Sequence, residues 1–284
     1  MPEPLFSLDQ FSTLVDGLDH PEGVAWGADG NWYAGGEAGQ IYRIASDGGF
    51  TQVASTGGFV LGLALDGNHN IYACDLSQNK VFKVSAAGDV SVYSEGSADR
   101  EFVAPNYPVF TDSGDLYVSS SGGFDEKNGC VFVIRRDGET IIASEAIDHF
   151  PNGMALSLDG RELYIILSNM PGIVKAAIRS DGTLGEPQLV AEMPGTVPDG
   201  LAFDAEGNLY IACYAPNKVF RFTAAGVLEL AAEDWQSVVL SAPTNIAFGG
   251  ADMRYAIFGS LGRWHLSMIE MPVAGARLRY PDLG

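Results

Sequence analysis

The sequence repeats one short plan six times, and this periodicity constrains the fold more strongly than any single motif. Each repeat begins with a short apolar segment, passes through a glycine-containing turn into a strand rich in aromatic and β-branched residues, and adds two further strands. Equivalent positions in the first and sixth repeats, 22 and 244, lie five repeats apart, which gives about 44 residues per repeat. This is the length of a four-stranded propeller blade. The six starting segments are 21–26, 60–65, 105–110, 151–156, 198–203 and 243–248.

The sixth repeat predicts three strands, at 246–248, 255–258 and 265–270, and the chain after 277 leaves little room for a fourth. We expect residues 11–15, near the N-terminus, to supply the missing strand. Pairing the first strand with the last closes the ring and removes an exposed sheet edge. The sequence therefore predicts an all-β, six-bladed β-propeller with four-stranded blades, and residues 1–284 as one domain.

Composition excludes several classes of partner. The chain has 36 Asp and Glu residues against 16 Lys and Arg, a formal net charge of −20. Such a surface repels phosphate backbones and anionic lipids, so we expect neither nucleic acid nor membrane partners. The N-terminal segment lacks the basic and apolar regions of a secretory signal, which favours a cytoplasmic location. Three cysteines lie far apart in apolar surroundings and are predicted to be buried and unpaired: Cys74, Cys130 and Cys213.

The residue just before each inner strand of a propeller should lie on the rim of the central channel, so six such positions converge on one axis. Among them are two carboxylates and two carboxamides, an oxygen-only donor set with a charge of −2. These donors suit Ca²⁺ best, and Mg²⁺ or Mn²⁺ less well. Zn²⁺ is possible but less suited, because no His or Cys is among the six. The rim residues are Glu22, Leu61, Asn106, Asn152, Asp199 and Thr244.

Several of these segments resemble the regucalcin (senescence marker protein) and gluconolactonase family. The resemblance is carried by the Pro-Glu-Gly at 21–23, the Pro-Asn-Gly at 151–153, and the runs 198–208 and 243–250. More distantly, the order Glu, Asn, Asn, Asp across blades one, three, four and five resembles the calcium-binding phosphotriesterases of the diisopropylfluorophosphatase and paraoxonase type. The resemblance implies a six-bladed propeller with a divalent metal in its channel that hydrolyses a cyclic ester.

The resemblance also implies roles for individual residues. Glu22, Asn152 and Asp199 match the family's metal ligands, and Asn106 matches an amide that contacts metal or substrate. Asp199 matches the acid usually assigned as general base. A cation would polarise the lactone carbonyl, while Asp199 accepts a proton from water or attacks as a nucleophile; both alternatives remain open. We predict substrate contacts from Asn106, Tyr107 and His149.

Departures from the family pattern bear on the substrate. Members often carry an Arg and an Asp where this chain has Ala104 and Tyr107, and an Asp where it has Leu167. These changes make the pocket mouth less polar and favour a more apolar lactone or ester. His20 lies near the same rim as His149, and either could shuttle protons, bind substrate, or serve only as a loop residue. The aromatic and Met side chains expected in the rim loops could wall a pocket or pack between blades: Tyr107, Phe124, Phe150, Met170, Tyr214 and Trp264.

Two other classes of function fit the same pattern. The first is a non-catalytic calcium-binding propeller that binds a small molecule or a protein. The second is a phosphotriesterase or a lyase that uses the same metal site. The leading hypothesis is a metal-dependent lactonase acting on a small lactone or ester.

Overall fold

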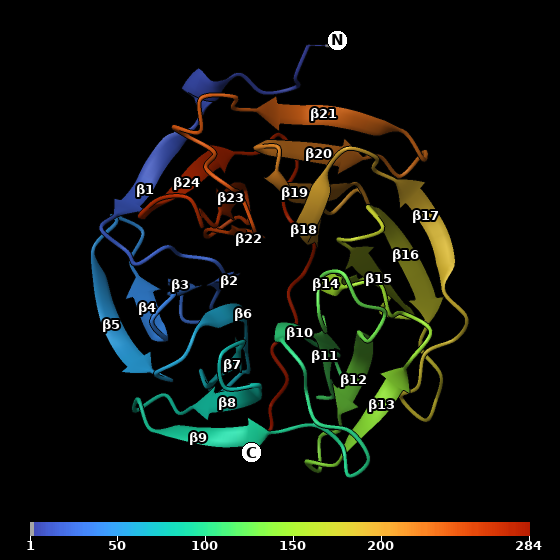
Figure 1. Ribbon diagram of the computed structural model, residues 1–284. Helices are drawn as coiled ribbons and strands as arrows, with labels where there is room; N and C mark the ends of the chain where they lie inside the picture. Colours follow the sequence, from blue (N-terminus) through green and yellow to red (C-terminus); the bar gives the residue numbers. More distant parts are fainter. Residues whose placement is uncertain (1–2) are drawn as a thin grey trace.

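Each repeat folds as an antiparallel sheet of four strands, and the six sheets stand in a ring around a central axis (Figure 1). The computed structural model describes residues 3–284; Met1 and Pro2, which the predicted domain includes, lie outside the described residues. The predicted six-bladed β-propeller is confirmed. Blades one to three comprise β2–β5 (Val24–Trp26, Trp32–Gly35, Gln40–Ile44, Phe50–Ser55), β6–β9 (Val60–Leu65, Ile71–Asp75, Lys80–Val84, Val90–Ser94) and β10–β13 (Pro105–Phe110, Leu116–Ser120, Cys130–Ile134, Thr140–Ser144). Blades four and five comprise β14–β17 (Pro151–Leu156, Glu162–Leu167, Gly172–Ala177, Gln188–Glu192) and β18–β21 (Val197–Phe203, Leu209–Ala215, Lys218–Phe222, Leu228–Glu233).

The sixth blade is built from both ends of the chain, as predicted. Strands β22 (Ile246–Gly249), β23 (Tyr255–Phe258) and β24 (His265–Glu270) are completed by β1 (Ser12–Asp16), which follows a short 3-10 helix, η1 (Leu8–Gln10). Strand β1 pairs antiparallel with β24, from Ser12 opposite Met268 to Asp16 opposite His265. Because this pairing joins the N-terminal strand to the last blade, the ring is closed by backbone hydrogen bonds.

Buried aspartates shape the turns between the first and second strands. Asp66 accepts hydrogen bonds from the backbone N–H groups of Asn68 and Asn70, both at 2.9 Å, and its other oxygen accepts one from Tyr72 Oη at 3.1 Å. Asp204 makes the same backbone contacts in blade five. A carboxylate that satisfies the N–H groups of the turn explains the Asp that begins the turns at 66–70 and 204–208.

A left-handed residue precedes the inner strand in four blades. His20, Ala104, Phe150 and Ala242 have φ values of 41°, 55°, 52° and 46°. This conformation is uncommon for a residue with a side chain, and it turns the chain from the outer edge of the ring toward the axis. We call the end of the channel where the inner strands begin the upper end, and the opposite end the lower end.

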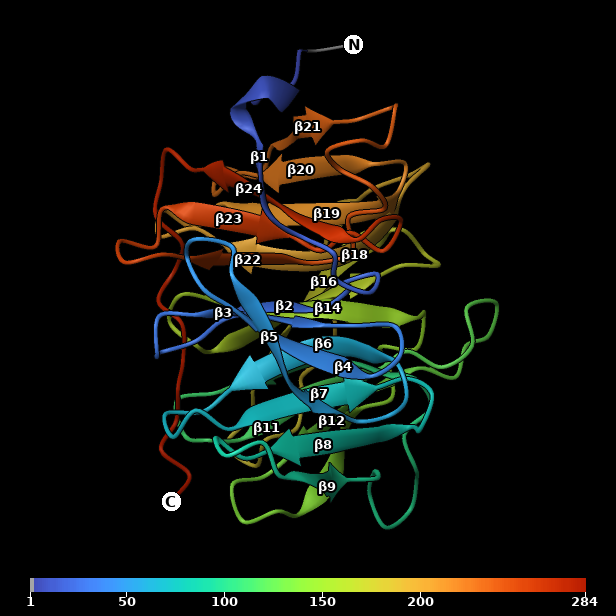
Figure 2. The same cartoon turned by 90° about the vertical axis from the view of Figure 1, so that its left-hand side faces the viewer.

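The C-terminal segment 274–284, here called the tail, runs along the lower face and crosses the lower end of the channel (Figures 1 and 2). It forms hydrogen bonds with all six blades, including one from Gly275 N to Met253 O at 2.8 Å and one from Tyr280 Oη to Trp26 O at 2.7 Å. All three cysteines are buried and free, as predicted. Within residues 3–284, no helix has the length and apolar character that a membrane span requires.

Candidate active site

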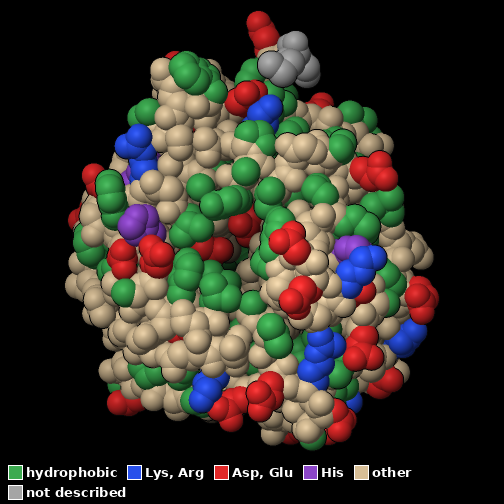
Figure 3. All heavy atoms as spheres, viewed as in Figure 1, with side chains coloured by type: hydrophobic (Ala, Val, Ile, Leu, Met, Phe, Trp, Pro, Cys, Tyr) green, Lys and Arg blue, Asp and Glu red, His purple; other side chains and the backbone are tan. Residues whose placement is uncertain are grey.

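Glu22 and Asp199 meet at the upper end of the channel, from blades one and five. Their exposed fractions are only 4% and 8%. Burial raises the pKa of Glu22 well above its usual range, and the negative charge of Asp199 raises it further. Burial also raises the pKa of Asp199, to about 8, although a hydrogen bond with Asn152 partly opposes the rise. Acidic side chains are visible at the bottom of a central hollow in Figure 3.

Asn152, from blade four, belongs to the same cluster. Its Nδ2 donates a hydrogen bond to Ser168 Oγ at 3.2 Å, and Ser168 Oγ donates to Pro198 O at 2.6 Å. This arrangement fixes the amide, while Asn152 Oδ1 and Glu22 Oε2 have no hydrogen-bond partner among residues 3–284. A buried acceptor without a partner is costly, so these two oxygens call for a cation or a donor from a ligand.

Asn106 lies at the equivalent position of blade three and is 6% exposed. Thr244, in contrast, uses its hydroxyl to donate a hydrogen bond to the backbone carbonyl of Glu22 at 3.1 Å. Thr244 therefore fixes the backbone of Glu22 and does not present its hydroxyl to the cluster through this bond. The donors of the cluster are two carboxylates and amide oxygens, which is the chemistry that Ca²⁺ prefers.

Glycine follows the rim residue in four blades because neighbouring inner strands approach one another closely there. A Cβ on Gly200 would lie 2.7 Å from Thr244 O, and one on Gly153 would collide with Asp199 O. Blade three differs, because Tyr107 follows Asn106. The Tyr107 side chain is half-buried near Glu22 and Asp199, and desolvation together with their negative charges raises the pKa of the phenol far above its usual value. Its hydroxyl therefore stays protonated and can donate a hydrogen bond.

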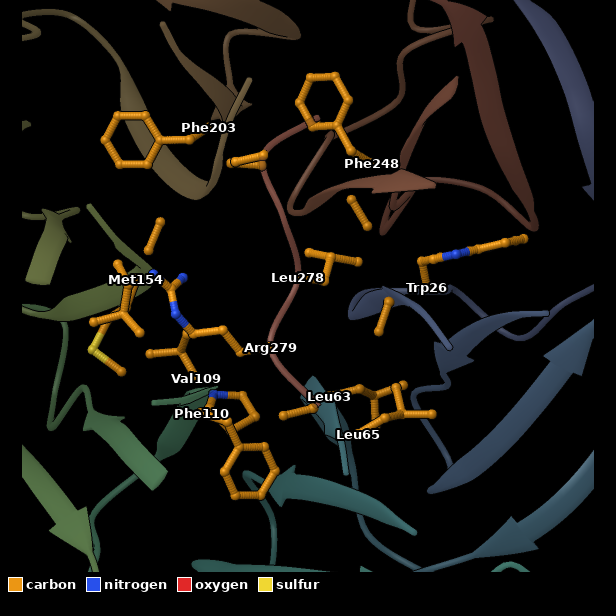
Figure 4. A pocket seen from close by; sticks show the side chains of 18 of the residues that line it. Trp26, Leu63, Leu65, Val109, Phe110, Met154, Phe203, Phe248, Leu278 and Arg279 are labelled. Carbon is orange, nitrogen blue, oxygen red and sulfur yellow. The ribbon is translucent and has the colours of Figure 1, made fainter. Parts of the chain in front are cut away.

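A separate cavity of about 160 Å³ lies at the lower end, and Tyr107 also lines it. Small residues at equivalent positions of the inner strands leave this space: Ala25, Ala64, Val109, Ala155, Ala202 and Ala247. Leu278 and Arg279 of the tail cross the cavity (Figure 4). Tyr107 thus forms a floor between the acidic cluster and the lower cavity.

The two rim histidines have different surroundings. His20 Nδ1 lies 3.1 Å from both Asp19 Oδ1 and Glu37 Oε2, and its ring is 5.5 Å from that of Trp264. The potential ligand atoms of Asp19, His20 and Glu37 lie within 4.8 Å of one another, on the partly exposed rim. His149 lines a groove with residues of the outer strand β17, and its contact with substrate stays a prediction.

Sequence reasoning missed the hydroxyl residues that support the cluster. Ser121 and Ser168 each come directly after the second strand of a blade, and each donates a hydrogen bond to the carbonyl of a proline in the next inner strand, Pro151 O at 2.8 Å and Pro198 O at 2.6 Å. The sequence signal that could have identified them is a serine directly after the second strand of a repeat.

A six-bladed propeller with a buried oxygen-donor cluster on its axis defines the class of this protein. The chain belongs to the SMP-30/Gluconolactonase/LRE-like family, whose sequence profile matches residues 20–260. The resemblance to regucalcin and gluconolactonase is therefore confirmed.

Curated relatives match part of the chain. A lactonase drp35 from Staphylococcus saprophyticus is 26% identical over 53% of this chain and 48% of its own length. Regucalcin from Danio rerio is 31% identical over 48% of this chain and 47% of its own length. The chain thus spans about half the length of these relatives.

Solved structures match over nearly the whole chain. A gluconolactonase from Xanthomonas campestris has a TM-score of 0.79 at 21% identity, over 92% of this chain and 89% of its own. A calcium-binding regucalcin from Agrobacterium tumefaciens has a TM-score of 0.78 at 17% identity, over 95% and 96% of the two chains. Likeness at this level of identity shows a shared fold.

Proposed function

We propose that this protein is a metal-dependent hydrolase that opens a lactone. The observation that carries the proposal is the pair of buried carboxyls, Glu22 and Asp199, in which Glu22 Oε2, like the neighbouring Asn152 Oδ1, has no hydrogen-bond partner in the part of the chain that the structure describes. Two buried carboxyls repel each other when both are ionised, and a cation stabilises that ionised pair; without one, their raised pKa values keep them protonated to higher pH. The names of the relatives, lactonase drp35 and gluconolactonase, support hydrolysis of a lactone.

Glu22, Asn106, Asn152 and Asp199 would hold the metal, with Ca²⁺ as the preferred ion. When bound, the cation would polarise the ester carbonyl and stabilise the negative charge that develops on its oxygen. Regucalcin among the relatives supports a divalent metal.

The chain's own residues supply the remaining steps. Asp199 accepts a proton from the attacking water, or attacks the carbonyl carbon itself to form an anhydride, which a water molecule then hydrolyses to free the carboxylate. The carbon–oxygen bond of the ring breaks, the ring oxygen leaves as a hydroxyl with a proton, and a hydroxy acid is the product. Tyr107 contacts the substrate from the floor of the hollow, Asn106 from its wall, and His149 from the rim.

A lactone panel on the calcium-loaded protein, with and without a chelator, tests this function. We expect proton release that stops on chelation and that Asp199→Asn lowers at least about 10³-fold, the scale for loss of a reacting group. Asp125→Asn, an exposed change on the same face, is the matched control and should keep full activity. Calcium binding without turnover of any lactone would favour the non-catalytic calcium-binding propeller.

A further inference from the structure

Two pairs of rings stand at the upper end of the channel. The His20 and Trp264 rings are 5.5 Å apart, and the Phe124 and Phe150 rings are 5.1 Å apart. His20 comes two residues before Glu22 in blade one, and Phe150 comes two residues before Asn152 in blade four. Blades one and four face each other across the ring (Figure 1). The acidic cluster therefore lies between two ring-bearing walls.

Both walls are built on the left-handed residues that precede inner strands. The same backbone position carries Ala104 in blade three and Ala242 in blade six, so only two of the four such positions present a ring. Neighbouring loops hold the rings in place. The Asn169 amide in blade four donates a hydrogen bond to Phe124 O at 2.6 Å, and two carboxylates hold His20 Nδ1.

The walls leave apolar surface in contact with water. Trp264 and Phe124 are 55% and 45% exposed, and Figure 3 shows hydrophobic side chains bordering the central hollow. Exposed apolar surface beside a polar site is typical of a ligand-binding pocket. A ligand whose polar group reaches the acidic cluster would place its remaining atoms between these rings.

Charge at the upper end disfavours anionic ligands. Asp19 and Glu37 add negative charge beside His20. At the same end, Lys80, Arg100 and Lys218 are each paired with a glutamate, at 2.6, 3.5 and 3.4 Å. Arg263 Nε donates a hydrogen bond to Ser237 O at 2.7 Å, and Lys127 is an exposed cation in the loop that carries Phe124.

We propose that the two ring pairs bind the alkyl chain of a neutral lactone, so that the preferred substrates are alkyl-substituted lactones and not polyhydroxylated or anionic sugar lactones. This assignment rests on the proposed lactonase function. Each methylene group that enters between the rings leaves water, and this should raise kcat/KM about threefold to fourfold per methylene until the walls are filled.

The first test is a chain-length series on the calcium-loaded protein: γ-butyrolactone, γ-hexalactone, γ-nonalactone and γ-undecalactone, with D-glucono-1,5-lactone for comparison. We expect kcat/KM to rise along the series and to be lowest for the sugar lactone. Trp264→Ala and Phe124→Ala should each flatten the rise of kcat/KM with chain length. Trp235→Ala is the control, because Trp235 is 81% exposed on the same face, in the β21–β22 loop.

The second test separates binding from catalysis. Calorimetric titration with 3-alkylcyclopentanones, ketones in which a methylene group replaces the ring oxygen of a γ-lactone and which are not hydrolysed, should give Kd values that fall with chain length in the parent and in Asp199→Asn. Turnover of lactones with no chain-length effect would overturn the alkyl-chain assignment and leave the lactonase function standing. Chain-length-dependent ketone binding without any lactone turnover would support the apolar walls and overturn the proposed function. Equal Kd values for all ketones would overturn the assignment directly.

Discussion

The same six inner strands present polar side chains at the upper end of the channel and small apolar side chains at the lower end. At the upper end, the buried atoms Glu22 Oε2 and Asn152 Oδ1 have no hydrogen-bond partner within the described residues, and the carboxyls of Glu22 and Asp199 repel each other when ionised. At the lower end the strands present alanines and a valine, and the tail satisfies the backbone groups around them. Binding chemistry is therefore concentrated where polar groups are left unsatisfied, while the opposite end contributes stability.

The tail contributes to the stability of the lower end through hydrogen bonds to several blades. Arg279 donates hydrogen bonds to Asp112 Oδ2 and to Ser157 O, both at 3.2 Å, and Gly67 N donates to Pro281 O at 2.8 Å. A single segment thereby links blades that are far apart in the sequence. Four predictions follow from the contrast between the two ends, in order of decreasing effect.

Deleting residues 275–284 should have the largest effect, because it removes hydrogen bonds to every blade and exposes the lower cavity. At about 1 kcal/mol per hydrogen bond and about 2 kcal/mol for each buried large side chain, we expect a loss of about 5 kcal/mol or more of unfolding free energy. Urea denaturation measures it. Arg277→Ala is the control and should cost under about 1 kcal/mol, because its ion pair with Asp112 is exposed. A truncated chain as stable as the parent would show that the tail does not hold the ring together.

The metal-free protein should lose stability as the pH rises. The pKa values of Glu22 and Asp199 are raised in the folded state, that of Asp199 to about 8. Their contribution is therefore fully present below the unfolded values, about 4, and is lost as pH rises toward 8, by up to about 1.4 kcal/mol per pH unit for each of the two groups. Melting temperatures between pH 5 and 8, with chelator, test this. Excess Ca²⁺ or Asp199→Asn should flatten the profile, and a flat profile in the metal-free parent would contradict a buried carboxyl pair.

Glu22→Gln should weaken Ca²⁺ binding about 10-fold to 100-fold, because it removes one of the two charges of the donor set while keeping the shape of the side chain. Calorimetric titration with Ca²⁺ gives the affinity. Glu37→Gln, an exposed change on the same rim, should change it little. Equal affinities in parent and Glu22→Gln would count against Glu22 as a ligand.

Ser168→Ala should have the smallest effect, because Ser168 acts through Asn152. Loss of the hydrogen bond to Asn152 Nδ2 frees the amide to rotate, and we expect about a 10-fold loss of Ca²⁺ affinity. Ser121→Ala in blade three is the matched control: it removes an equivalent bond, to Pro151 O, but no bond to a side chain of the cluster. Equal losses in both variants would indicate a general effect on packing.

The repeat pattern was sufficient to predict the blades, the N-terminal strand of the last blade and the rim positions. Turn residues and alternating apolar residues determine strands and turns within one repeat. Ring closure was predicted because the sixth repeat has only three strands and the N-terminal segment can supply the fourth. The rim residues Glu22, Asn152 and Asp199 were predicted by position within the repeat, and the structure brings these three together. Their assignment to metal and catalysis stays a prediction, as does that of Asn106, Tyr107 and His149.

Other features were not predictable from local sequence, because they depend on contacts between distant segments. The tail has no strand pattern, and its hydrogen bonds exist only once six blades surround it. Tyr107 was expected to wall a pocket or to pack between blades, but its position between the acidic cluster and the lower cavity depends on contacts across the ring. The pairing of Trp264 with His20 joins the two ends of the chain and exists only in the closed ring.

The sequence by itself therefore determined the number of blades and the residue type at each rim position, since both follow from short-range periodicity. The tertiary structure alone decided which of those oxygens remain without partners, which rings face the cluster, and which end of the channel is sealed. These depend on desolvation and on distances across the ring, and no local segment contains that information.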